Sequence, residues 1–228
     1  MSNYVHKRSN IISDSEILQT VSGCTIEFTD GDPPVQGSVP ISKISQQERL
    51  VVDKEIQNLI EKRVLEKTVR EDGEFSSSIF LVPKRNGTHR FILNLKQFNL
   101  NAEYHRFKME TFLIALKLIF KGCFMASIDL KDACYGVPVH QKYRKFLKFI
   151  WRDSLFQFTC LPNGLSCARR KYIYTKLIKP VNAFLHQMGH SVTGFLDDML
   201  IVAGTEVDLI SPVTFVPRTL LELGFVIN

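Results

Sequence analysis

The fold is decided by residues 192–203, Val-Thr-Gly-Phe-Leu-Asp-Asp-Met-Leu-Ile-Val-Ala. Two apolar runs, 192–196 and 199–203, leave only Asp197 and Asp198 between them. Short apolar runs joined by two residues predict a β-hairpin. Asn-Gly or Gly-Asn would suit so tight a turn better than two aspartates. The pair therefore indicates a chemical role for this turn.

Asp129 is a third carboxylate in an unusual position. It follows residues 123–128, Cys-Phe-Met-Ala-Ser-Ile, an apolar run typical of a buried strand. Like charges about 4 Å apart repel by roughly 4 kcal/mol at an effective dielectric constant of about 20. A fold tolerates such a cluster most readily when divalent cations neutralise it, and carboxylate oxygens favour Mg²⁺ or Mn²⁺ over zinc. Two such ions activate an attacking hydroxyl and stabilise a leaving phosphate.

A second hairpin signature lies earlier in the chain. Residues 77–84 and 89–95 flank Asn86-Gly87, a pair that accepts positive φ and predicts a two-residue type I′ turn. Lys84, Arg85 and Arg90 lie near its tip, where they are either solvated or bind phosphate.

The other elements are expected from periodicity and turn residues. Ser45 and Glu48 form a capping-box pattern at the start of a helix over residues 46–67. Further helices are expected over 108–121 and 167–188, a helix end at 220–224, and another hairpin over 144–160 around Arg152-Asp153. Trp151, Phe156 and Phe158 are expected in the core of that hairpin.

Charge is distributed unevenly along the 228 residues, although the formal net charge is only +6. Residues 76–190 hold 19 Lys and Arg against 5 Asp and Glu, whereas both flanking segments are net acidic. A basic solvated face would explain this block without a partner. Its mixture with aromatic residues favours a polyanion instead, which composition leaves open as nucleic acid, nucleotide or lipid surface.

Composition and missing motifs exclude several classes of protein. The 45% hydrophobic content excludes a disordered chain. The most apolar stretch, residues 111–120, is too short for a membrane span, which needs about 20 residues. The chain shows no secretory signal, and its five scattered cysteines suggest reduced thiols in an intracellular protein, cytoplasmic or nuclear. Walker A, G-x-G-x-x-G and G-x-S-x-G patterns are absent, and Gln187 between His186 and His190 removes the zinc-protease reading.

Four motifs in order resemble those of retroelement reverse transcriptases. They are Phe80-Leu-Val-Pro-Lys-Arg-Asn-Gly-Thr-His-Arg-Phe-Ile-Leu-Asn-Leu-Lys-Gln-Phe-Asn99, Ser127-Ile-Asp-Leu-Lys-Asp-Ala133, Leu161-Pro-Asn-Gly-Leu-Ser166 and Phe195-Leu-Asp-Asp198. Each is weak alone, but their order and spacing from about residue 45 to the end are specific. Residues 107–111, 129–133 and 176–180 resemble the tyrosine-recombinase (DIRS-type) retrotransposons most closely.

The resemblance implies an α+β fold, the fingers and palm of a right-hand polymerase. The palm would be an antiparallel sheet backed by helices, and the thumb would be absent. Fingers are expected over 45–122 and palm over 123–228, with some fingers segments inserted between 140 and 160. Residues 1–44 are expected to be a poorly defined N-terminal extension.

The resemblance also implies a role for each matching residue. Asp129, Asp197 and Asp198 would be catalytic and would bind two Mg²⁺, with Mn²⁺ as the alternative. Three groups of residues would bind the nucleotide. The fingers cations Lys84, Arg85 and Arg90 would bind the triphosphate, and Asp132, Ala133 and Cys134 would line the triphosphate and sugar pocket. Asn163 and Gly164 would lie in a turn beside the nucleotide and the template. A primer 3′-hydroxyl would attack the α-phosphate of a dNTP and release pyrophosphate. Partners would be an RNA or DNA template-primer and the thumb and RNase H portions of a longer polyprotein, with no membrane.

Four features depart from the family pattern. Cys134 stands where an aromatic usually blocks a 2′-hydroxyl, and Phe195 stands where Tyr is usual. Arg169-Arg-Lys171 intervenes where the family usually has Pro and an aromatic, in the helix beside the nucleotide pocket, and the chain stops before the usual lysine-bearing strand and thumb. These departures support an alternative reading, a degenerate or domesticated fragment that binds nucleic acid without catalysis. An RNA-directed RNA polymerase ranks lower, because Asp129 and Asp132 are too close together and Leu196 replaces a common Gly.

Overall fold

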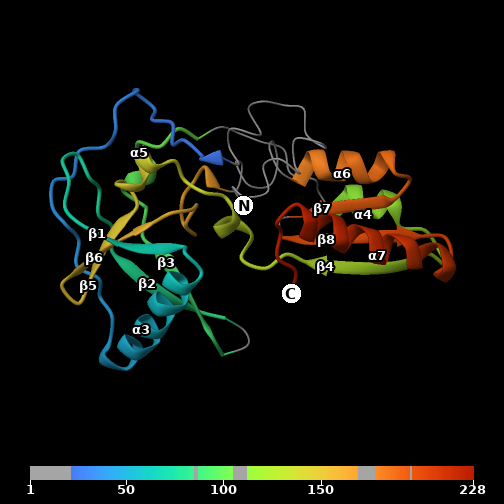
Figure 1. Ribbon diagram of the computed structural model, residues 1–228, viewed down its shortest axis with the longest axis horizontal. Coiled ribbons are helices and arrows are strands. Elements are labelled where there is room, and N and C mark those ends of the chain that lie inside the picture. Colours follow the sequence, from blue (N-terminus) through green and yellow to red (C-terminus); the bar gives the residue numbers. More distant parts are fainter. Residues whose placement is uncertain (1–21, 85–86, 105–111, 169–177, 196) are drawn as a thin grey trace. The chain divides into compact units, whose positions relative to one another are not determined.

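The computed structural model describes residues 22–84, 87–104, 112–168, 178–195 and 197–228. The chain forms two compact units (Figure 1). We name Gly23–His105 with Pro138–Ala168 the hairpin unit, and Met1–Ser22, Arg106–Val137 and Arg169–Asn228 the aspartate unit. Each unit combines helices with antiparallel strands, which confirms the expected α+β class.

The hairpin unit contains two antiparallel sheets. One has the strand order β1-β6-β5 and consists of β1 (Leu65–Thr68), β5 (Lys148–Trp151) and β6 (Ser154–Phe158). The other pairs β2 (Ile79–Pro83) with β3 (His89–Leu93). Its helices are α3 (Gln46–Glu61), the short α5 (Gln141–Arg144) and the 3₁₀ turn η2 (Phe98–Leu100).

Aromatic rings fill the core of the hairpin unit. Phe149 stacks on Phe156 with ring centroids 5.4 Å apart, and Phe91 packs at 5.5 Å from Phe149. Phe156 and Phe158 are buried, which confirms that they are core residues and not exposed platforms for bases.

Helix α3 begins as expected and ends earlier. Ser45 and Glu48 form both bonds of the capping box, with 3.3 Å from the Glu48 N–H to Ser45 Oγ and 3.0 Å from the Ser45 N–H to Glu48 Oε2. The predicted end at residue 67 is wrong, because Arg63 adopts φ 59° and the chain enters β1. Leu50 is 74% exposed, and Val52, Ile56 and Leu59 form the buried stripe of this helix.

The two hairpin turns differ in how well the sequence predicted them. Arg152 and Asp153 both adopt positive φ, 45° and 60°, which confirms a two-residue turn between β5 and β6. Between β2 and β3 the Lys84 N–H bonds the Thr88 carbonyl at 2.7 Å. Three residues, not two, therefore lie between the last bonded positions. Gly87, at φ 79°, supplies the left-handed position that such loops require.

Lys148 is a fully buried cation on β5. Its Nζ donates to the Val69 carbonyl at 2.9 Å, to Glu71 at 2.7 Å and to Glu74 at 2.8 Å. Burial alone would raise the pKa of Glu74, but hydrogen bonds from Lys148, from Arg70 and from the Glu71 N–H outweigh it and lower the pKa. The buried charge is thus satisfied by three acceptors of the 69–74 segment.

Part of the acidic N-terminal region packs within the hairpin unit. Cys24 and Ile26 are 1% and 2% exposed, and the Cys24 N–H bonds the Pro138 carbonyl at 2.8 Å. The side-chain amide of Gln36 donates to the Ser76 carbonyl and accepts from the Ser76 N–H, both at 2.6 Å. This segment therefore contributes core side chains and satisfies backbone groups of the strands it borders.

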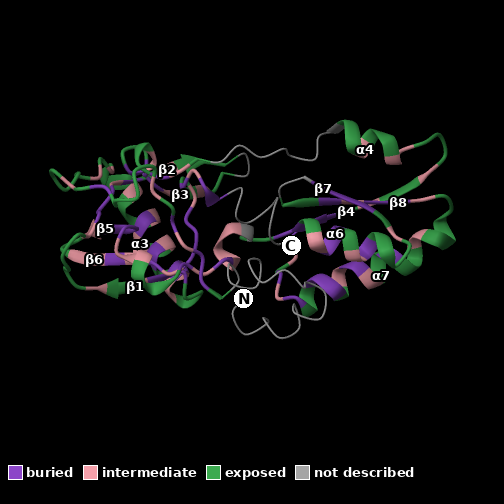
Figure 2. Ribbon diagram, turned by 90° about the horizontal axis from the view of Figure 1, so that it is seen from above, coloured by how far each residue is buried: buried purple, intermediate pink, exposed green. Residues whose placement is uncertain are grey.

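The aspartate unit is one antiparallel sheet with helices against it. Its strands are β4 (Phe124–Asp129), β7 (Ser191–Phe195) and β8 (Asp198–Ala203), in the order β4-β8-β7. Figure 2 shows α6 and α7 on one face of this sheet and α4 on the other. The helices are α4 (Phe112–Leu118), α6 (Ile178–Gln187), α7 (Glu206–Glu222) and the 3₁₀ turn η3 (Ala133–Gly136).

The sheet packs most closely on α6 and α7. Val181 and Leu185 of α6 and Val216 and Leu220 of α7 are each at most 1% exposed, whereas Leu113 of α4 is 66% exposed. Helix α4 ends at Leu118 and α6 at Gln187, before the predicted ends at residues 121 and 188, and residues 108–111 and 169–177 of the predicted helices lie outside the described residues. Helix α7 ends as expected, because Gly224 at φ 81° lets the Phe225 N–H bond the Leu220 carbonyl at 3.0 Å.

Among the residues that the structure describes, no helix combines the length and apolarity needed to cross a membrane.

Candidate active site

The β7–β8 hairpin presents two of the predicted carboxylates. Phe195 pairs with Asp198, so the turn lies between these two residues and Asp198 is the first residue of β8. The expected turn at 197–198 is therefore displaced by one residue. The displacement matters because Asp198 sits in the sheet, where its position is set by strand register, while Asp197 lies in the turn itself.

Strand β4 brings the third carboxylate to the same end of the sheet. Asp129, its last residue, is the direct cross-strand partner of Asp198. The Leu130 N–H also donates to the Asp197 carbonyl at 2.7 Å. Register and this hydrogen bond together place three aspartates from two distant parts of the sequence in one cluster, whose side chains are exposed.

The cluster carries unfavourable electrostatic energy. Partial burial raises the pKa of the Asp198 carboxyl above its ordinary value, and the negative charges of Asp197 and Asp129 raise it further. Directly paired residues of an antiparallel sheet have Cβ atoms about 4.5–5.5 Å apart, and like charges there destabilise the pair. A cation bound between the carboxylates would relieve this repulsion.

The donor set fits a hard divalent cation. All three side chains offer only carboxylate oxygens, the ligands preferred by Mg²⁺ and Mn²⁺. In the described part of the chain, no group of three or more His, Cys, Asp or Glu side chains is already close enough together to hold a metal ion. The donor chemistry of Asp129, Asp197 and Asp198 therefore suits a hard cation, although their carboxylates are not gathered into a ready-made site in this structure.

Asn228 is a neighbour of this cluster that sequence reasoning missed. Its side-chain amide donates to Asp129 Oδ2 at 2.5 Å, and its backbone N–H donates to the Asp129 carbonyl at 3.0 Å. The only sequence signal was that Asn228 follows the apolar residues 225–227, which read as the start of a strand.

The predicted sugar-pocket residues follow β4 directly. Asp132 adopts the left-handed φ of 51° and precedes η3, which contains Ala133 and Cys134. The Tyr135 N–H bonds the Asp132 carbonyl at 2.9 Å, and the Val137 N–H bonds the Cys134 carbonyl at 3.2 Å. This tight turn keeps Asp132 and Cys134 within a few residues of Asp129 in the same unit.

The predicted cations belong to the hairpin unit. Arg90 pairs with Val82 across the β2–β3 ladder, and both Arg90 and Lys84 have exposed side chains. Arg85 lies outside the described residues. Phe80 and Val82, 40% and 38% exposed, are outward-facing apolar neighbours of Arg90 on the same two strands.

The turn that carries Asn163 and Gly164 is held against the end of β3. Gly164 has φ 107°, and a Cβ there would lie 2.6 Å from the Leu93 carbonyl oxygen. Asn99 grips the turn with both ends of its amide, donating to the Gly164 carbonyl at 2.8 Å and accepting from the Ser166 N–H at 3.0 Å. Asn99 is the last residue of the motif over residues 80–99, but nothing in the sequence indicated its contact with this turn.

The predicted site residues are thus divided between the two units. Asp129, Asp197 and Asp198, with the 132–134 turn, belong to the aspartate unit. Lys84, Arg90 and the 163–164 turn belong to the hairpin unit.

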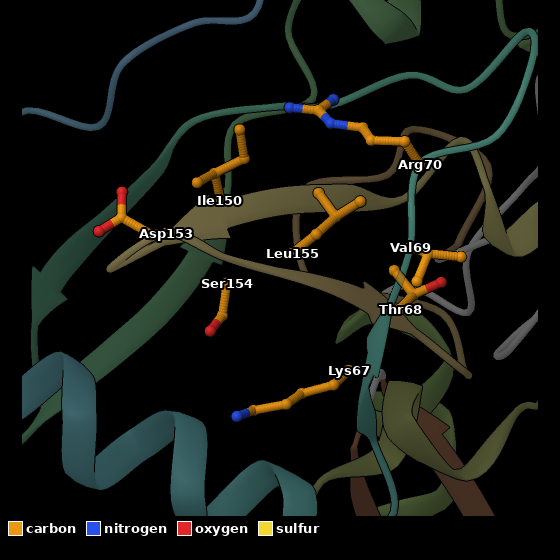
Figure 3. A pocket seen from close by; sticks show the side chains of 8 residues that line it. All are labelled: Lys67, Thr68, Val69, Arg70, Ile150, Asp153, Ser154 and Leu155. Atoms are coloured by element: carbon orange, nitrogen blue, oxygen red, sulfur yellow. The ribbon is translucent and has the colours of Figure 1, made fainter.

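A surface pocket of about 370 Å³ lies elsewhere on the hairpin unit (Figure 3). It opens beside β1 and the β5–β6 hairpin and contains none of the predicted site residues. Its lining side chains, all drawn in Figure 3, are Lys67, Thr68, Val69, Arg70, Ile150, Asp153, Ser154 and Leu155.

The fold and this cluster define an α+β protein with an acidic site built on the end of an antiparallel sheet. Residues 41–228 match the family described as reverse transcriptase (RNA-dependent DNA polymerase). The chain belongs to this family.

The curated relatives that it matches are transposon polyproteins. The chain is 24% identical over 151 residues to the transposon Tf2-3 and Tf2-7 polyproteins of Schizosaccharomyces pombe. That match covers 66% of this chain and spans 11% of each polyprotein.

Solved structures agree in fold. The native prototype foamy virus protease-reverse transcriptase superposes with a TM-score of 0.72 at 18% identity, over 88% of this chain and 26% of that one. A foamy viral protease-reverse transcriptase in complex with double-stranded DNA gives 0.71 at 19% identity, over 86% of this chain and 33% of that one.

Proposed function

We propose that this chain is the RNA-directed DNA polymerase part of a retroelement polyprotein. It would add dNTPs to a primer 3′-hydroxyl on an RNA or DNA template. The observation that carries the proposal is the direct pairing of Asp129 with Asp198, next to Asp197, in a chain of the reverse transcriptase family. The raised pKa of Asp198, caused by partial burial and by the charges of Asp197 and Asp129, supports this proposal. A purely structural role would not require three neighbouring carboxylates.

The three aspartates would form the catalytic centre. Two Mg²⁺, or Mn²⁺, supply activation of the attacking hydroxyl and neutralisation of the leaving pyrophosphate when bound there. Asp129 and Asp198, set by the sheet, would orient the centre, and Asp197 in the turn would complete it. A one-residue shift in the register of β4 or β8 would abolish this arrangement, because it would turn one carboxylate to the opposite face of the sheet.

The remaining predicted residues would hold the substrates. Lys84, Arg85 and Arg90 would bind the triphosphate, and the 132–134 turn would line the sugar pocket. Asn163 and Gly164, fixed by Asn99, would border the nucleotide and template. The basic stretch 76–190 would follow the nucleic-acid backbone, so we expect binding to weaken steeply with salt.

We further propose the finer assignments that the motifs suggest. Residues 45–122 would be fingers and 123–228 palm, with 1–44 as an extension. The motifs at 107–111, 129–133 and 176–180 support an element of the DIRS type. Thumb and RNase H portions would come from the rest of a longer polyprotein, as the small share of the transposon polyproteins that this chain spans suggests.

Mg²⁺-dependent primer extension on an RNA template tests the proposal. The wild-type chain should extend a DNA primer, and Asp197→Asn/Asp198→Asn should abolish extension while leaving template-primer binding intact. The second candidate is a fragment that binds nucleic acid without catalysis, which the Cys134 and Arg169–Lys171 departures favour. Binding by the wild type with no extension under Mg²⁺ or Mn²⁺ would establish that candidate instead.

A further inference from the structure

The C-terminal residues form an additional strand-like segment along the end of β4. Leu130 and Ile227 form an antiparallel bridge, and the Lys131 N–H bonds the Val226 carbonyl at 2.8 Å. Asn228 then bonds the Asp129 carbonyl through its own N–H at 3.0 Å. Asp129 is therefore enclosed between Asp198 on one side and Asn228 on the other.

The Asn228 side chain contributes a contact that the backbone does not need. Two backbone hydrogen bonds already attach the segment to the chain around Asp129. The amide of Asn228 makes a third bond, to Asp129 Oδ2 at 2.5 Å. Since the segment is held without it, this bond acts on the carboxylate itself and limits its rotation.

We propose that Asn228 is a positioning residue that orients the Asp129 carboxylate for cation binding; this inference rests on the proposed function. Asp129 faces two other negative charges, and a neutral amide donor holds it in place without competing for the cations. Donors of this kind behind metal-binding carboxylates fix ligand orientation, and their loss typically costs about 10–100-fold in metal affinity or activity.

Three variants of the full chain test this. Asn228→Ala removes the amide and keeps the backbone bond. Asn228→Leu keeps a similar volume but removes the amide donor without adding a charge. The matched control is Val226→Ala, on the same segment, because Val226 is 55% exposed and its carbonyl bond survives the change.

The primary measurement is Mn²⁺ affinity, followed by electron paramagnetic resonance of free Mn²⁺, with Asp129→Asn defining the signal that depends on the site. We expect about 10-fold or greater weakening in Asn228→Ala and in Asn228→Leu, and less than about 2-fold in Val226→Ala. Hydrogen exchange of the β8 amides should stay at the wild-type level in all three, which separates positioning from unfolding.

Primer extension distinguishes this inference from the proposed function. An Asn228→Ala variant should need more Mg²⁺ for half-maximal rate. If the wild type extends primers but Asn228→Ala matches it in both Mn²⁺ affinity and Mg²⁺ requirement, the positioning role is wrong and the function stands. If the wild type fails to extend but its Mn²⁺ affinity depends on both Asp129 and Asn228, the positioning role stands and the function fails. Absence of any Mn²⁺ binding that depends on Asp129 overturns the inference.

Discussion

Gly164→Ala should destabilise the hairpin unit. The glycine has φ 107°, where an L-residue is strained by about 1–3 kcal/mol. Its Cβ would also lie 2.6 Å from the Leu93 carbonyl oxygen, closer than real contacts allow. That oxygen is fixed because it accepts the Leu95 N–H at 3.0 Å at the end of β3. Relieving such overpacking costs a further 1–3 kcal/mol or so, giving a total loss of about 2–6 kcal/mol.

Urea unfolding followed by tryptophan fluorescence measures this loss. Trp151 is the single tryptophan and lies on β5, in the same unit as Gly164, so its emission reports on unfolding of that unit. Trp151 is held by a 2.8 Å hydrogen bond from its ring N–H to Asp53, which should break on unfolding.

Two other glycines of that unit separate strain from clash. Gly31 has φ 81° but open space around a Cβ, so Gly31→Ala should cost about 1 kcal/mol. Gly37 has open space without positive φ, so Gly37→Ala should stay within about 0.5 kcal/mol of wild type. If Gly164→Ala loses no more free energy of unfolding than Gly31→Ala, a clash of the added Cβ with the Leu93 carbonyl oxygen is excluded.

Further changes test other contacts. Asn99→Ala removes both bonds to the 161–166 turn, so we expect a loss of about 1–2 kcal/mol and a raised KM for dNTP with kcat little changed; an unaltered KM would contradict the clamp. Lys148→Met breaks a buried ion pair, so we expect the free energy of unfolding measured in urea to fall by about 3 kcal/mol. A fall of less than about 1 kcal/mol would refute the stabilising role of Lys148. The pKa of Glu74 is lowered in the folded protein, so its ionised carboxyl stabilises the fold at pH values above its ordinary pKa of 4.5. This stabilisation is lost as the pH falls through the lowered pKa of the folded state. As the pH is lowered below 4.5, the urea midpoint of the wild type should thus fall more steeply than the urea midpoint of Glu74→Gln. Parallel pH dependence in the two proteins would exclude this contribution of Glu74. Cys134→Phe places a bulky ring where the family usually has an aromatic, so the variant should show a greater preference for dNTP over rNTP in primer extension. Equal preference in both proteins would exclude a role of this position in rejecting rNTP.

Local patterns predicted the elements whose signals lie in neighbouring residues. Ser45 and Glu48 predicted a capping box because both bonds are made within one turn. The Arg152-Asp153 turn followed from the apolar runs on each side. The extent of α3 was harder to predict, because residues 62–67 continue a plausible helical pattern until Arg63 adopts left-handed φ and pairing with β6 takes over.

The site was predictable as a set of residue types but not as a register. The sequence indicated three aspartates, whereas only strand pairing shows that Asp198 faces Asp129 and that Asp197 occupies the turn. Asn99 and Asn228 escaped prediction for a related reason. Their partners lie 65 to 99 residues away in the chain, and an asparagine has no local pattern that reveals a distant contact.

The most direct test of the account is incorporation of a single nucleotide on an RNA-templated DNA primer under excess enzyme. The wild-type chain with Mg²⁺ should add the dNTP that the template encodes, and Asp129→Asn should slow that step by about 10³-fold or more while binding the same template-primer. Template-directed addition at the same rate in both proteins would contradict the assignment of Asp129. No addition by the wild type with either Mg²⁺ or Mn²⁺ would contradict the polymerase itself.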